Sequence, residues 1–176
     1  MGAIGKQVAS AKMGRGNGSF AVEGLYEEMT VTDVSVFDGE ENGLTHVVVE
    51  LSVQKFVPRG DSKPEDQPPG STVTWMQVIK PEIKKTILGN LKRAALIFIR
   101  QLALNANQPG WDKIDESSVT EDVIDNHIFC QNSKLIGLKI AGEAKQKKKK
   151  KSEGTIILLD FKNIQAQTQR ETQAAA

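Results

Sequence analysis

The sequence contains a single cysteine, Cys130, so no disulfide can form within the chain and a disulfide-built secreted scaffold is excluded. Long hydrophobic runs are also missing. The apolar stretch at 94–99 is bounded by Arg93 and Arg100 and falls far short of the roughly 20 residues that span a bilayer. The N-terminal residues carry no apolar signal segment. We therefore expect a cytoplasmic protein that does not enter a membrane.

Histidine is nearly as scarce, since His46 and His127 are the only two. His127 and Cys130 have the spacing of two metal ligands, but a zinc site needs three or four and no second pair accompanies them. The glycines at 14–18 lack the strand, the lysine and the helix that define a phosphate-binding loop. No nucleophile motif of the Gly-x-Ser-x-Gly type occurs. These absences predict a protein that is not an enzyme and needs no metal or cofactor.

The formal net charge is only +1, which taken alone does not indicate a partner of either sign. The charges are nevertheless strongly segregated. Residues 16–54 hold eight carboxylates and no lysine or arginine, whereas residues 134–151 hold eight lysines and one carboxylate. Segregation of this kind can place a basic face on a nearly neutral molecule, and a polyanion responds to the local field. The simpler interpretation is a solvated surface whose blocks neutralise one another.

Hydrophobic residues make up 39% of the chain, enough for one core without covalent staples. Residues 1–19 are rich in glycine, alanine and serine and lack a hydrophobic period, so we predict a flexible basic arm. Residues 165–176 are mostly glutamine, threonine and alanine and are predicted to form a flexible tail. The segment 20–164 remains as the folded domain.

Residues 23–57 have the period of strands. Val47, Val49, Leu51 and Val53 alternate with a set that includes Glu50, Ser52 and Gln54. The apolar pattern before them slips by one residue at 32–33, as at a β-bulge. Turn-forming Asp-Gly and Asn-Gly pairs separate the two runs. The pattern predicts a long antiparallel hairpin.

Three further elements follow. Residues 71–79 alternate as a third strand, and residues 83–104 carry one apolar stripe, at positions 88, 91, 95, 98 and 102, that predicts a helix packed on the sheet. Residues 135–142 and 154–161 are β-rich, and the segment 143–153 between them holds six lysines. We predict a second hairpin whose loop is this lysine-rich segment.

This order of elements predicts a mainly β fold: an OB-fold-like five-stranded antiparallel Greek-key barrel with one helix between strands three and four. In that fold the ligand groove lies over strands two and three, between the loops that join strands one to two and four to five. Single-stranded nucleic acid is held by cations along its phosphates and by aromatic rings that stack on its bases. Aromatic residues are only 5% of the chain. Phe56 shares a strand face with polar residues and is predicted to be exposed, whereas Trp75 suits core packing at least as well as stacking. The predicted nucleic-acid-binding residues are Lys55, Phe56, Trp75, Lys80, Lys139, Lys145, Lys147, Lys148, Lys149, Lys150 and Lys151.

The chain resembles a family of phage-encoded OB-fold proteins that bind single-stranded DNA or take part in replication. The resemblance spans roughly residues 24–164 and rests on Gly-Leu-Tyr at 24–26, Pro-Gly-Ser-Thr-Val-Thr-Trp at 69–75, the helix around 91–102 and Leu-Ile-Gly-Leu at 135–138. It implies sequence-independent binding of single-stranded DNA in phage replication or recombination, in the cytoplasm of a bacterial host. It also implies phage or host replication and recombination proteins as partners, with a homo-oligomer left open. One departure is that residues 165–176 lack the acidic tail by which many such proteins recruit partners.

A second hypothesis remains open from the same residues. A non-catalytic protein-interaction or virion-associated scaffold built on an OB-like barrel would use the acidic strands and the helix stripe for partner contacts. The lysine-rich segment would then dock on an acidic protein or on packaged DNA. A nuclear-localisation or RNA-binding tract is a further interpretation of the lysine run, but its position between two strands favours a phosphate-contacting loop.

Overall fold

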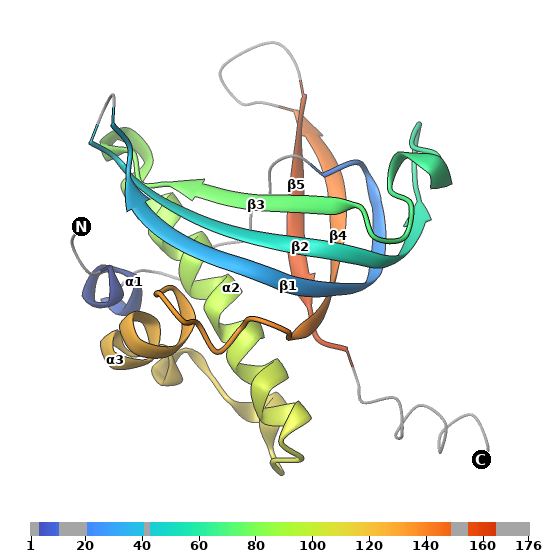
Figure 1. Cartoon of the computed structure of the whole chain (residues 1–176). Coiled ribbons are helices and arrows are strands. Elements are labelled where there is room, and N and C mark those ends of the chain that lie inside the picture. The colour runs from blue at the N-terminus through green and yellow to red at the C-terminus, as the bar shows by residue number, and fades with distance from the viewer. Residues whose placement is uncertain (1–3, 11–20, 41–42, 149–154, 165–176) are drawn as a thin grey trace.

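The computed structural model of the chain describes residues 4–10, 21–40, 43–148 and 155–164 (Figure 1). Five antiparallel strands form one open sheet in the order β3-β2-β1-β4-β5. The strands are β1 (Gly24–Asp38), β2 (Thr45–Pro58), β3 (Thr72–Val78), β4 (Lys139–Lys148) and β5 (Thr155–Lys162). The helices are α1 (Gly5–Ser10), α2 (Lys84–Asn105) and α3 (Glu121–Val123), and a π-helical turn, Ile124–Ile128, continues α3.

The β1–β2 hairpin confirms the prediction for residues 23–57. Its register runs from Gly24 opposite Pro58 to Asp38 opposite Thr45, and it shifts between Val31 and Asp33, where the apolar pattern slips. The shift lets the apolar side chains before and after it face the same core. A second irregularity near Tyr26 was not predicted. The predicted third strand is confirmed as β3, which pairs with β2.

The sheet curls around a core. In the part of the chain that the structure describes, it does not close through backbone hydrogen bonds, since β3 and β5 are its two edges. Trp75 on β3 is fully buried, and its ring centroid lies 5.4 Å from that of Phe161 on β5. The core therefore fills the space between the two edge strands. The mainly β prediction is confirmed as an open five-stranded sheet.

Helix α2 confirms the predicted helix almost to the residue. Its stripe is buried at Leu88, Leu91, Ala95 and Phe98, and the Phe98 ring lies 4.8 Å from the Phe161 ring. The helix placement nevertheless differs from the single helix predicted. The chain between β3 and β4 holds α2, several short 3-10 turns, α3 and the π-helical turn, and α1 precedes β1. In Figure 1, α2 crosses beneath the sheet and α1 and α3 lie together beside it.

The prediction of a flexible arm is wrong for residues 4–10. Ile4 and Val8 are buried, and the backbone N–H of Gly5 donates to Asp125 at 2.7 Å. At the other end of α1, the buried amine of Lys92 donates to the Ala9 carbonyl at 2.9 Å. The apolar pair four residues apart and these two polar contacts dock α1 on α2 and α3. The rest of the predicted arm, and the predicted tail at 165–176, lie outside the described residues.

Candidate nucleic-acid interface

The lysine-rich segment begins inside a strand, which corrects the predicted loop at 143–153. Strand β4 stays paired with β5 as far as Lys148 opposite Thr155, with Lys147 opposite Ile156 and Lys145 opposite Leu158. The β-branched residues at the start of β5 supply the strand partner that lysines need, because lysine alone favours strands weakly. The structure places the backbones of Lys147 and Lys148 in β4, whereas Lys149, Lys150 and Lys151 lie outside the described residues.

Alternation along β4 separates a core face from an outer face. Ile140, Gly142 and Ala144 are buried, whereas Lys139 and Lys145 project from the opposite face with 62% and 65% of their side chains exposed. On β5, Lys162 is paired with Ala141 and is 50% exposed. We call Lys139, Lys145 and Lys162 the basic β4–β5 face.

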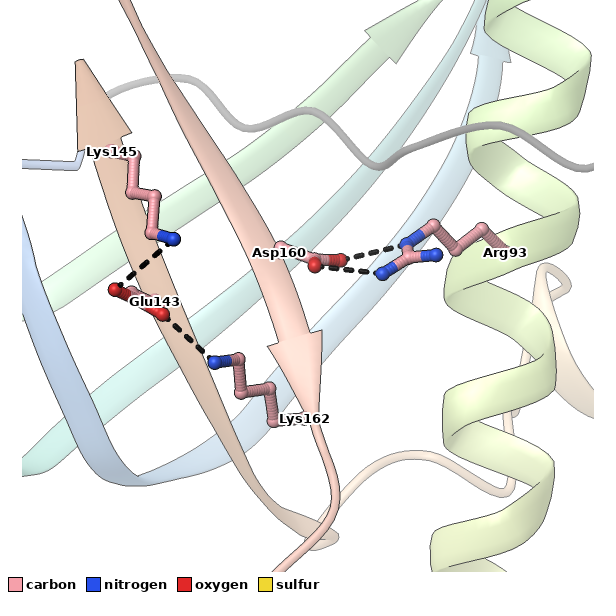
Figure 2. Close-up of polar contacts among 5 residues, drawn as sticks. All are labelled: Arg93, Glu143, Lys145, Asp160 and Lys162. Carbon is pink, nitrogen blue, oxygen red and sulfur yellow. Dashed lines mark hydrogen bonds and ion pairs between the residues drawn. The ribbon is translucent and has the colours of Figure 1, made fainter.

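Glu143 lies between two of these lysines (Figure 2). Its Oε2 accepts from Lys162 Nζ at 2.8 Å, and its Oε1 lies 3.6 Å from Lys145 Nζ. The hydrogen bond from Lys162 is the largest cause that holds the pKa of the Glu143 carboxyl below its ordinary value, and the charge of both lysines adds to it. Both carboxylate oxygens are therefore already paired within the face.

Asp160, the neighbour of Glu143 across the ladder, turns to α2 instead (Figure 2). The Arg93 guanidinium binds it through two parallel hydrogen bonds, Nε to Oδ1 at 2.9 Å and Nη2 to Oδ2 at 2.8 Å. The hydrogen bond to Asp160 raises the pKa of Arg93, which stays charged. This bidentate pair fastens the hairpin to the helix and occupies the second carboxylate on this side of β5.

The remaining predicted lysines are spread over the sheet. Lys139 pairs with Glu28 at 3.1 Å between Nζ and Oε1, and Lys55 is exposed on β2 opposite the same Glu28. Lys80 is exposed just after β3, where that strand ends beside the start of β2. The structure therefore brings Lys139 and Lys145 onto one strand face and leaves Lys80 at a different end of the sheet.

Neither predicted aromatic residue is strongly exposed. Phe56 is half-buried rather than exposed: its ring centroid lies 4.9 Å from that of buried Tyr26, and the ring covers Gly24 so closely that a Cβ there would overlap it. Phe56 is the direct cross-strand partner of Tyr26, beside the register shift in β1. Trp75 is fully buried between Phe161 and Phe129.

Sequence reasoning missed Lys162, Arg93 and Phe37 as members of basic or aromatic surfaces. Lys162 and Arg93 could not be placed because their positions depend on the β4–β5 register and on how α2 crosses β5. The position of Phe37 could have been predicted from the strand alternation, because Val34 is on the buried face and residue 37 then lies on the outer face. Its exposed fraction is 44%.

Within the ranges that the structure describes, no three His, Cys, Asp or Glu side chains gather as a metal site would require. No helix among those residues has both the length and the apolar character needed to cross a membrane. No protein-family model matches the chain, and no curated protein matches it.

Proposed function

We propose that the protein binds single-stranded DNA without sequence preference, with phosphates contacting the basic β4–β5 face and the lysine run that continues from it. The observation that carries this proposal is the pairing of β4 with β5 through Lys148. Because of this pairing, the lysine run at 147–151 begins within the β4–β5 hairpin, two residues after exposed Lys145, and not in a free loop. Cations at fixed backbone positions can follow a phosphate chain with less ordering cost than cations on a free loop.

The pairing of the nearby carboxylates supports the same proposal. Glu143 is occupied by Lys145 and Lys162, and Asp160 is occupied by Arg93. Glu143 and Asp160 are therefore already neutralised by Lys145, Lys162 and Arg93. The five lysines at 147–151 add positive charge beyond these pairs. A polyanion is the ligand class for which such a cluster is suited, and counterion release would make binding strongly salt-dependent.

The sheet order supports an OB-type interpretation of the fold as part of the proposal. β1 is flanked by β2 and β4, and the edge strands β3 and β5 approach through Trp75 and Phe161. Closing these edges would give the five-stranded barrel, which binds oligonucleotides over strands two and three and at the one–two and four–five loops. The β4–β5 hairpin would then stand at the second of those loops. We place the protein in replication or recombination of phage DNA in the cytoplasm of a bacterial host, on the family resemblance alone.

The test is a fluorescence-anisotropy titration of labelled oligo-dT at several salt concentrations. Replacing Lys145 and Lys162 with glutamine should weaken binding and flatten the plot of log K against log salt by about 0.7 for each phosphate that the protein no longer neutralises. Serine at all of 147–151 should have a larger effect. The matched control replaces Lys63 and Lys113, exposed lysines on other elements, with glutamine and should change little. Absence of binding by the unaltered protein at low salt, or equal losses in the control, would overturn the proposal.

A protein-interaction scaffold is the second candidate, and Ile136 favours it. This side chain is 50% exposed in the turn just before β4. An exposed apolar side chain is stabilised more by contact with a partner protein than by contact with water. Native mass spectrometry without DNA distinguishes the two candidates, because a scaffold should assemble in the absence of nucleic acid.

A further inference from the structure

An aromatic pair lies on the outer face of the sheet, away from the basic β4–β5 face. Phe37 on β1 and His46 on β2 are direct cross-strand partners, and their rings are stacked with centroids 5.1 Å apart and planes 4° apart. His46 is also fixed by the residue just before β2, since its Nδ1 lies 2.9 Å from the Leu44 carbonyl, which can only accept a hydrogen bond. The orientation of the two rings is therefore set by strand pairing and a hydrogen bond.

Only one face of the Phe37 ring is covered by this stack. The β1–β4 ladder ends at Thr30 opposite Lys139, so the described part of β1 that carries Phe37 has no strand partner on that side. Phe37 is 44% exposed and is the one aromatic side chain among the strongly exposed large hydrophobic residues of the described chain. A flat ring with one face supported and the other open is the geometry on which a base stacks.

Exposed cations follow β3, on the His46 side of this pair. His46 is opposite Val78, the last residue of β3, and the Ile79 N–H donates to the Thr45 carbonyl at 2.9 Å. The chain then continues directly into Lys80 and, at the start of α2, Lys84 and Lys85, all of them exposed. Figure 1 shows the ends of the β1–β2 hairpin, of β3 and the start of α2 on the same side of the molecule.

Carboxylates limit the direction from which a polyanion can approach. Asp38 and Glu40 are exposed where β1 leaves the sheet, and Glu82 stands between the lysines of this segment. The Asp38 carboxylate accepts from the Thr45 hydroxyl at 2.9 Å and is thereby kept beside the hairpin. Phosphates would be repelled at the hairpin end and attracted on the side of β3 and α2.

We propose that Phe37, supported by His46, is a stacking platform for a nucleobase of single-stranded DNA, with Lys80, Lys84 and Lys85 contacting phosphates farther along the strand, on the other side of His46. The inference rests on the proposed single-strand binding and adds to it a second contact region that recognises bases and not only charge. It replaces half-buried Phe56 and fully buried Trp75 as the source of base stacking.

The test compares two probes of equal length and charge: oligo-dT, and the same sugar–phosphate backbone without bases. Phe37→Ala should weaken oligo-dT binding by about tenfold, within the range for stacking of one base on an aromatic ring. Its affinity for the abasic probe and its salt slope should not change. Phe37→Trp, which keeps an aromatic ring at this position, should keep the preference for oligo-dT over the abasic probe. Ile136→Ala, which removes an apolar side chain of similar exposure in the turn before β4, is the matched control and should bind both probes as the unaltered protein does.

The outcomes separate the two proposals. If the unaltered protein binds neither probe at low salt, single-strand binding fails and the platform fails with it. If it binds both probes and Phe37→Ala lowers affinity for both equally, or for neither, binding stands and the platform is wrong. Because Phe37 is so exposed, the variant should keep its melting temperature, which shows that a loss of binding is not a loss of fold.

Discussion

Trp75 and Phe161 stand on the two edge strands of an open sheet, yet their rings meet edge to face, with centroids 5.4 Å apart and planes at 62°. This arrangement is favourable for two aromatic rings beyond the area that it buries. The edges of the sheet are therefore connected through the core and not through backbone hydrogen bonds. Trp75 is a structural residue in a position where the sequence also allowed a ligand contact.

A buried Trp75 predicts a distinctive fluorescence signal. In a Trp111→Phe background, Trp75 is the only tryptophan left, and its emission should be blue-shifted, resistant to acrylamide quenching and unaffected by oligo-dT. Trp75→Ala should cost about 3–5 kcal/mol of the free energy of unfolding, as for other large-to-small core changes. Quenching of Trp75 by oligo-dT would show instead that the ring is accessible to bases.

Tyr26 predicts a loss of stability in alkali. Burial raises the pKa of its hydroxyl to about 12, although the hydrogen bond that the hydroxyl oxygen accepts from the Val22 N–H opposes the shift. Because the folded pKa lies above the unfolded value of about 10, the stabilisation is complete below pH 10 and is lost as the pH rises toward 12. Tyr26 is the only tyrosine, so the tyrosinate absorbance reports it directly. Titration of the folded protein near pH 10 would contradict the described burial.

A substitution at Gly5 tests whether α1 is docked on the rest of the protein in solution. A Cβ at this position would overlap the Glu121 carbonyl and lie 2.6 Å from the Asp125 carboxylate. Gly5→Ala should therefore destabilise the protein by about 1–3 kcal/mol, the usual cost of overpacking, and should increase hydrogen exchange in α1. Deleting residues 1–10 sets the upper limit of the effect. Unchanged stability in both variants would mean that α1 contributes nothing to the fold.

The Arg93–Asp160 pair predicts a measurable but small coupling. Its side chains are 36% and 33% exposed, so solvent screens the attraction, while the bidentate geometry places it near the upper end for surface pairs. A double-mutant cycle with Arg93→Ala and Asp160→Ala, followed by urea unfolding, should give about 0.5–1 kcal/mol. Purely additive single effects would show that the pair does not fasten β5 to α2.

The elements that sequence reasoning placed well are those with a local signal. The alternation of Val47, Val49, Leu51 and Val53 has the period of a strand, and the slip at 32–33 matches the register shift of β1. The apolar stripe of α2 likewise follows from its own spacing. In each case the periodicity of one segment was enough to define its buried face.

The parts that were wrong depend on distant partners. Whether Lys147 and Lys148 belong to a loop or a strand is decided by Ile156 and Thr155 across the hairpin. Gly5 lies in a segment whose composition is typical of a flexible arm, and it is docked because Asp125, 120 residues away, accepts its N–H. The basic segment that contains Lys145 was therefore predictable from the sequence. The position of Lys162 beside it, on the other side of Glu143, was not.

The central claim is that single-stranded DNA contacts the basic β4–β5 face, and amine-reactive footprinting read by mass spectrometry tests it most directly. Lysines are acetylated with and without saturating oligo-dT at low salt, and the modification rate of each is compared. The account predicts slower acetylation of Lys139, Lys145 and Lys162 with DNA present, and unchanged rates at Lys63 and Lys113. Unchanged rates on the basic β4–β5 face, or equal protection of all five lysines, would contradict it.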